Sequence, residues 1–199
     1  MLKSLLSLLL FLSVSVAHAS PPDDVSLCRS QDEEKRYDCY GSLARSHKIP
    51  MDWHFIELQD PIDDTWGTMA ILRAWRGESP SGANPALVLR CSSGTLDILM
   101  SWEWNLNGAQ QTVTYRFGKS SPVTSKWDTA NSGDGTFYPG DSLDFLNQLS
   151  VEDRLVVRLS EMQAPNITAH FNLTGLTQIK NIMTQTCDLP QRGNRQSTF

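Results

Sequence analysis

The sequence predicts a mainly β domain, α+β overall, whose antiparallel strands form a sandwich or a barrel-like sheet. Large apolar residues alternate with polar ones along six segments, as they do in strands that bury one face. Most of these segments are separated by short turn sequences such as Asn107-Gly108, which is typical of antiparallel hairpins rather than βαβ units. Helical spacing of apolar residues is confined to an N-terminal segment, a short internal segment and a C-terminal helix.

Residues 1–19 have the features of a secretory signal peptide. Lys3 precedes an apolar run at 5–16, and the small residues of Ala17-His18-Ala19 stand where a signal peptidase cuts. The apolar run is too short to span a membrane comfortably. We therefore expect cleavage after residue 19 and a periplasmic mature chain with no membrane span.

The charge of the chain limits its partners. Lys and Arg number 17 against 22 Asp and Glu, which gives a formal net charge of −5. Removing residues 1–19 takes away Lys3 and no acidic residue, so the mature charge is −6. An acidic chain is repelled by nucleic acid and by anionic membranes, so we expect neither as a partner.

Four cysteines, Cys28, Cys39, Cys91 and Cys187, follow the signal peptide. An even number in an exported chain predicts two disulfides, for which three pairings exist. A zinc site is the competing interpretation. It would require a Cys-x-x-Cys pair or a Cys/His cluster, and the sequence has neither.

Spacing favours one pairing of the cysteines. Cys28 and Cys39 are eleven residues apart and would be separated by ~16 Å on one straight helix, beyond the reach of a disulfide. However, Ser30-Gln31-Asp32-Glu33 is a capping box, which predicts that a new helix begins there after a turn. Such a turn would bring Cys28 next to Cys39. By elimination, Cys91 is then expected to pair with Cys187.

The elements follow in chain order. Residues 31–46 have helical composition and end before Pro50, and residues 51–64 are mixed. The segments with strand periodicity are 66–76, 86–92, 95–104, 112–117, 155–159 and 167–174. The Gly- and Pro-rich stretches 77–85 and 131–140 are expected to be loops.

Two further helices carry apolar stripes. Asp141–Leu149 places Leu143, Leu146 and Leu149 on one side. Gly175–Cys187 places Leu176, Ile179, Ile182, Met183 and Cys187 on one side. Residues 188–199 have no apolar face and are expected to be a disordered tail, so a single disulfide-bonded domain is predicted over 20–187.

The sequence contains no catalytic signature. Neither a nucleophile elbow nor a phosphate-binding glycine loop is present. His47, His54 and His170 lack the spacing of zinc ligands and are interpreted as surface residues. We therefore expect no cofactor, no metal and no enzymatic activity.

The acidic residues before the second strand allow two interpretations. Asp63 and Asp64, beside Trp66, are expected to cap the turn that enters the strand. Alternatively, together with Glu57 or His54, they line the cleft of a cell-wall hydrolase. The first interpretation is preferred, because aspartate at a strand entry more often caps a turn.

Tryptophan is the other candidate for a binding site. Trp102 shares its strand face with aliphatic residues and is expected in the core. Four others lie near segment ends, where they act either as lids of the core or as an exposed patch of a ligand-binding or inhibitor domain. These are Trp53, Trp66, Trp75 and Trp127.

Five pieces of the chain, in order, resemble the VasI/TagO family of accessory proteins of bacterial type VI secretion systems. The pieces are Cys28 with Arg36-Tyr37-Asp38-Cys39-Tyr40, Trp53 with Pro61-Ile62-Asp63-Asp64-Thr65, Leu87-Val88-Leu89-Arg90-Cys91 with Thr95, Val113-Thr114-Tyr115-Arg116 with Trp127, and Phe171-Asn172-Leu173-Thr174-Gly175-Leu176 with Cys187. The resemblance implies a periplasmic accessory protein that binds an envelope or secretion-apparatus protein. It adds Arg116 and Trp127 to the candidate binding residues and carries over no catalytic residue.

Overall fold

The structure, a computed structural model, describes residues 28, 31, 35, 39, 42, 52–59, 62, 64–160 and 166–187, of which Leu58 and Trp66 are described in the backbone only. The expected signal peptide and C-terminal tail lie outside the described residues. So does most of the helix expected at 31–46, which is therefore not tested.

Nine strands form one antiparallel sheet in the order β1-β2-β3-β4-β7-β6-β5-β8-β9. They are β1 (Trp53–Gln59), β2 (Trp66–Arg73), β3 (Ala86–Ser92), β4 (Thr95–Ser101), β5 (Gln110–Phe117), β6 (Val123–Thr129), β7 (Gly135–Phe137), β8 (Arg154–Ser160) and β9 (Ile167–Asn172). The mainly β prediction is therefore confirmed, with more strands than the six expected.

The sheet is curved, so that its last strand, β9, lies beside the segment that follows β2. Beyond Arg73 the chain bends at Trp75, and Arg76 then forms an isolated β-bridge with His170 of β9. The amide of Trp75 donates to the carbonyl of His170 at 3.0 Å, and the amide of His170 donates to the carbonyl of Arg76 at 2.8 Å. The arrangement is closer to the barrel-like alternative than to two separate sheets.

Three strands, β1, β6 and β7, were not predicted from the sequence. In β1 residue type does not match burial, because the apolar Ile56 is exposed whereas the acidic Glu57 is half-buried. Trp127 is the one buried residue of β6, and β7 consists of three residues inside the stretch expected to be a loop. Periodicity cannot reveal strands that bury one residue or span only three.

The strand predicted over 95–104 is too long. β4 ends at Ser101, and Glu103 adopts a positive φ of 52°, which no regular strand accommodates. Trp102 is nevertheless fully buried, as expected, and its indole donates to the hydroxyl of Thr136 at 3.0 Å. Trp104 is only partly buried against the core.

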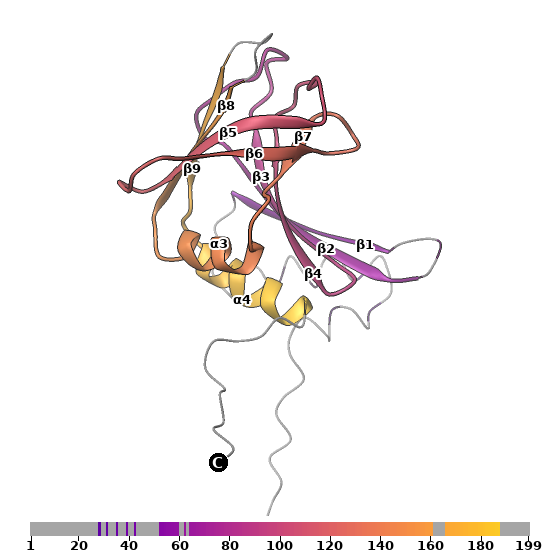
Figure 1. Cartoon of the computed structure of the whole chain (residues 1–199). Helices are drawn as coiled ribbons and strands as arrows, with labels where there is room; N and C mark the ends of the chain where they lie inside the picture. Colours follow the sequence, from indigo (N-terminus) through magenta and orange to yellow (C-terminus); the bar gives the residue numbers. More distant parts are fainter. Residues whose placement is uncertain are drawn as a thin grey trace, which may run out of the picture.

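The helices α3 (Ser142–Leu149) and α4 (Leu176–Thr186) confirm the internal and C-terminal helices. Both lie in the space between an arm formed by β1–β4 and an arm formed by β5, β6, β8 and β9 (Figure 1). The carboxylate of Asp141 caps α3 by accepting from the amide of Asp144 at 2.8 Å. One part of the prediction is wrong: Phe145, rather than Leu143, is among the buried residues of α3.

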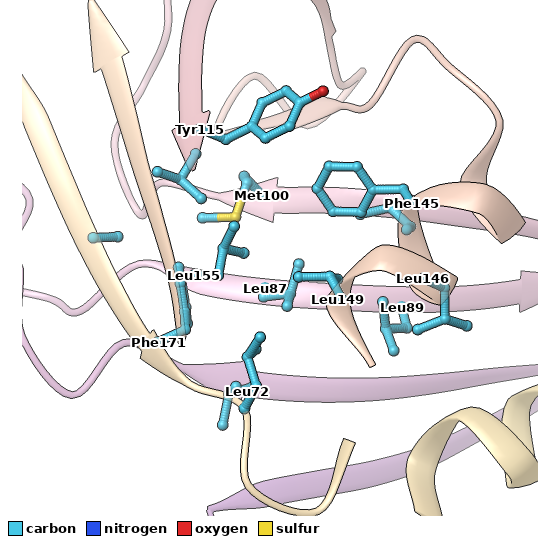
Figure 2. Close-up of a cluster of buried hydrophobic side chains, with 14 of the residues drawn as sticks. Leu72, Leu87, Leu89, Met100, Tyr115, Phe145, Leu146, Leu149, Leu155 and Phe171 are labelled. Atoms are coloured by element: carbon cyan, nitrogen blue, oxygen red, sulfur yellow. The ribbon is translucent and has the colours of Figure 1, made fainter. Parts of the chain in front are cut away.

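The core lies between α3 and the inner face of the sheet. Figure 2 shows Phe145, Leu146 and Leu149 over the strands that carry Leu87 and Met100. All five side chains are at most 1% exposed. Burial of each such side chain stabilises the fold by about 1.5–3 kcal/mol.

Both predicted disulfides are present. Cys28 bonds to Cys39, and Cys91 of β3 bonds to Cys187 at the end of α4, which confirms the pairing argued from spacing. Two disulfides are typical of a protein that folds outside the reducing cytoplasm. Over the described residues, the structure contains no helix of the length and apolarity needed to cross a membrane.

Candidate functional site

Asp64 lies in the turn between β1 and β2. It is exposed, adopts a positive φ of 57°, and accepts a hydrogen bond from the side chain of Gln59 at 3.3 Å. Aspartate is one of the few residues other than glycine that tolerate this conformation. This geometry fits the turn-capping interpretation of Asp64. Asp63 and the side chain of Trp66 lie outside the described residues.

The groups named for a hydrolase cleft occupy different faces of β1. His54 and Ile56 are exposed, whereas Trp53 is buried and Glu57 is half-buried. An odd spacing of three residues turns His54 and Glu57 to opposite sides of the strand. Only one of the two can therefore share a face with Asp64.

Trp127 is part of the core. Its side chain is 1% exposed, its ring lies edge-on to those of Tyr115, Tyr138 and Phe145, and its indole donates to Ser125 at 3.0 Å. Burial in this aromatic cluster, reinforced by a hydrogen bond to Tyr138, raises the pKa of Tyr115 above its usual range. A ring so enclosed serves packing, in keeping with the interpretation of Trp127 as a lid of the core.

Arg116 is different, because it stands on the outer face of the sheet. β5 alternates strictly between buried and outward residues, and Arg116 is exposed. The register places Arg116 beside Val156 of β8, Val156 beside His170 of β9, and His170 beside Arg76. These four residues therefore form a row across the outer face at the point where the sheet closes.

Two more residues complete this surface. Trp75 is 61% exposed, and its ring lies 5.9 Å from that of His170. Arg158 lies two residues from Val156 on the same face of β8, and its Nε donates to Thr168 at 3.1 Å. We call this surface the cationic patch; its members are Trp75, Arg76, Arg116, Val156, Arg158 and His170.

The arginines of the cationic patch form no ion pair with any carboxylate that the structure describes. Over the part of the chain that the structure describes, no carboxylate lies within ion-pair distance of Arg76, Arg116 or Arg158. Arg90, by contrast, contacts Asp97 at 2.6 Å. The pKa of His170 is lowered by partial burial and by the charges of Arg76 and Arg116.

Sequence reasoning found only part of the cationic patch. Arg116 was singled out from the family resemblance, Trp75 was one of four tryptophans near segment ends, and His170 was interpreted as a surface residue. Arg76 and Arg158 were not selected. Their polar-face positions are visible in the sequence, but their proximity depends on strand order and on the closure of the sheet.

Within the described ranges, no group of three or more His, Cys, Asp or Glu side chains is arranged to hold a metal ion. The cationic patch presents guanidinium groups and an indole, which bind carboxylates and apolar groups.

Comparison with known proteins adds little. No family model and no curated protein matches the chain. Among solved structures it is similar to the crystal structure of invasion associated protein B from Bartonella henselae, with a TM-score of 0.49 and 9% sequence identity over 69% of this chain and 94% of that one. A similarity of this size carries no argument about function.

Proposed function

We propose that the chain is an exported, periplasmic accessory protein of a bacterial type VI secretion system and acts by binding a protein of the envelope or the apparatus. The observation that carries the binding role is the cationic patch. Trp75 is 61% exposed and lies beside three arginines that form no ion pair with a described carboxylate, so a partner can both cover the indole and supply the missing acidic groups. Tryptophan and arginine are also the residues that dominate binding energy at protein interfaces.

Two further observations support the cellular context. The five pieces that resemble the VasI/TagO family run in order from Cys28 to Cys187, and the signal-like segment precedes them. The two disulfides fit an oxidising compartment. Around His170 the neighbours in the row are arginines and Val156, groups that recognise a partner rather than transform a substrate.

The proposal is tested by deleting the gene in its own bacterium and measuring type VI secretion into the medium. We expect secretion to fall on deletion and to be restored by the full chain supplied in trans. A chain that lacks residues 1–19 should accumulate in the cytoplasm and fail to restore it. Normal secretion in the deletion strain would contradict the assignment to this system.

A further inference from the structure

The cationic patch has a defined spacing. His170, Val156 and Arg116 occupy matching positions on the adjacent strands β9, β8 and β5, and Arg76 continues the row through its β-bridge to His170. Neighbouring strands lie about 4.8 Å apart, so the backbones of Arg76 and Arg116 are separated by roughly 14 Å. Between the two guanidinium groups lie an imidazole and an aliphatic side chain, and Trp75 stands beside the imidazole.

An extended peptide matches this spacing. Its side chains alternate between two faces and advance about 3.4 Å per residue, so residues i and i+4 share a face and lie roughly 14 Å apart. Carboxylates at these positions meet Arg76 and Arg116, and guanidinium groups bind carboxylates through two parallel hydrogen bonds. A side chain at i+2 then faces Val156 and His170 and is best apolar.

We propose that the cationic patch binds an extended acidic segment of the partner protein, with two carboxylates four residues apart and an apolar residue midway. This inference rests on the proposed function, since it names the chemistry of the partner that the accessory protein binds. The net charge of −5 on the chain as a whole repels long polyanions, so a short acidic segment with an apolar contact is favoured over nucleic acid or a polyanionic polymer.

A second copy of the chain is the competing occupant. Asp60-Pro61-Ile62-Asp63-Asp64 has the required spacing, and Ile62 is 90% exposed. However, the carboxylate of Asp64 already accepts a hydrogen bond from Gln59 within its own turn. Asp64 also adopts a positive φ of 57°, which is not the extended conformation that the required spacing assumes, and this favours a segment of another protein.

The probe is the acetylated, amidated nonapeptide GSESLSESG, titrated into the 15N-labelled mature protein and followed by the indole N–H signal of Trp75. The control peptide GSSEELSSG has the same composition but adjacent glutamates. We expect GSESLSESG to shift the Trp75 signal, and GSSEELSSG to bind about tenfold more weakly, because only one guanidinium is engaged at a time. Equal binding of the two peptides, or no binding, would overturn the proposal.

Variants of the protein test whether GSESLSESG binds at the cationic patch. Combining Arg76→Glu with Arg116→Glu should weaken binding of GSESLSESG by at least about tenfold, because two attractive charges become repulsive. Lys119→Glu, an exposed residue in the turn after β5, makes the same change of charge as Arg116→Glu alone and should weaken binding far less than that single variant. Unchanged affinity in the double variant would also overturn the proposal.

Two measurements separate the outcomes. Sedimentation of the mature protein alone should show a monomer; association that Asp64→Arg abolishes would assign the cationic patch to a second copy and overturn a foreign partner. If GSESLSESG binds as expected while deletion of the gene leaves secretion normal, the proposed function fails and the peptide specificity stands. If deletion abolishes secretion and GSESLSESG does not bind, only the peptide specificity fails.

Discussion

Replacing Gly77 with alanine tests the closure of the sheet beside the cationic patch. Gly77 follows the bridge between Arg76 and His170 and adopts a φ of +121°. A Cβ at this position would lie 2.3 Å from the carbonyl oxygen of Thr168 and 2.9 Å from the Cα of Ala169. Both are backbone atoms of β9 and cannot rotate away, so alanine must push the two segments apart.

Two effects of Gly77→Ala lower the free energy of unfolding. A residue other than glycine at this φ carries backbone strain of about 1–3 kcal/mol. Separation from β9 also weakens the hydrogen bonds from the amide of Trp75 to His170, at 3.0 Å, and from the amide of His170 to Arg76, at 2.8 Å. Each contributes about 1 kcal/mol. We therefore expect Gly77→Ala to lower the free energy of unfolding by roughly 3–5 kcal/mol.

The assay is urea unfolding followed by tryptophan fluorescence, with Gly94→Ala as the matched control. Gly94 also has a positive φ, +74°, but no atom lies within 4 Å of its built Cβ. It should lose only the cost of a left-handed conformation, about 1–2 kcal/mol. If Gly77→Ala is no less stable than Gly94→Ala, the close approach to β9 does not hold the sheet closed and the reasoning is refuted.

Three further predictions concern the disulfide, the histidine and the acidic turn. Replacing both Cys91 and Cys187 by serine should lower the free energy of unfolding by about 2–5 kcal/mol in urea denaturation, because the bond closes a separation of 96 residues; a smaller loss would contradict the chain-entropy argument. Because the pKa of His170 is lowered in the folded state, stability should fall as the pH drops from above 6.5 through the folded pKa. Arg116→Gln should raise the pKa of His170 measured by NMR titration, and an unchanged pKa would show that Arg116 does not act on it. Asp64→Ala should cost about 1 kcal/mol, mainly by removing a side chain that tolerates a positive φ, and a loss of secretion from the fully folded variant would show that Asp64 has a functional role instead.

Local patterns were enough to predict six of the nine strands, two helices and both disulfides. β5 and β8 alternate strictly between buried and outward residues, so their faces are readable without any knowledge of their neighbours. The stripe that includes Ile179 and Met183 likewise predicted the buried side of α4. In each case the information lies within a dozen residues of chain.

Features that depend on distant contacts could not be predicted. The closure at Arg76 joins β9 to the continuation of β2, more than ninety residues earlier in the chain, through backbone hydrogen bonds that carry no residue signature. The row from Arg76 to Arg116 exists only because β9 and β8 lie between them. Trp127 illustrates the converse, since a tryptophan near a segment end has two interpretations until the surrounding rings are placed.

Secretion by a strain whose only copy of the chain carries Trp75→Ala and Arg116→Glu tests the central claim most directly. The control strain carries Val151→Ala, which truncates an apolar residue that is 81% exposed, and Lys119→Glu, which makes the same change of charge. The account predicts that the variant of the cationic patch reaches the periplasm with the control's level and melting temperature, yet secretes no more than the deletion strain. Secretion at the control's level from that folded variant would contradict it.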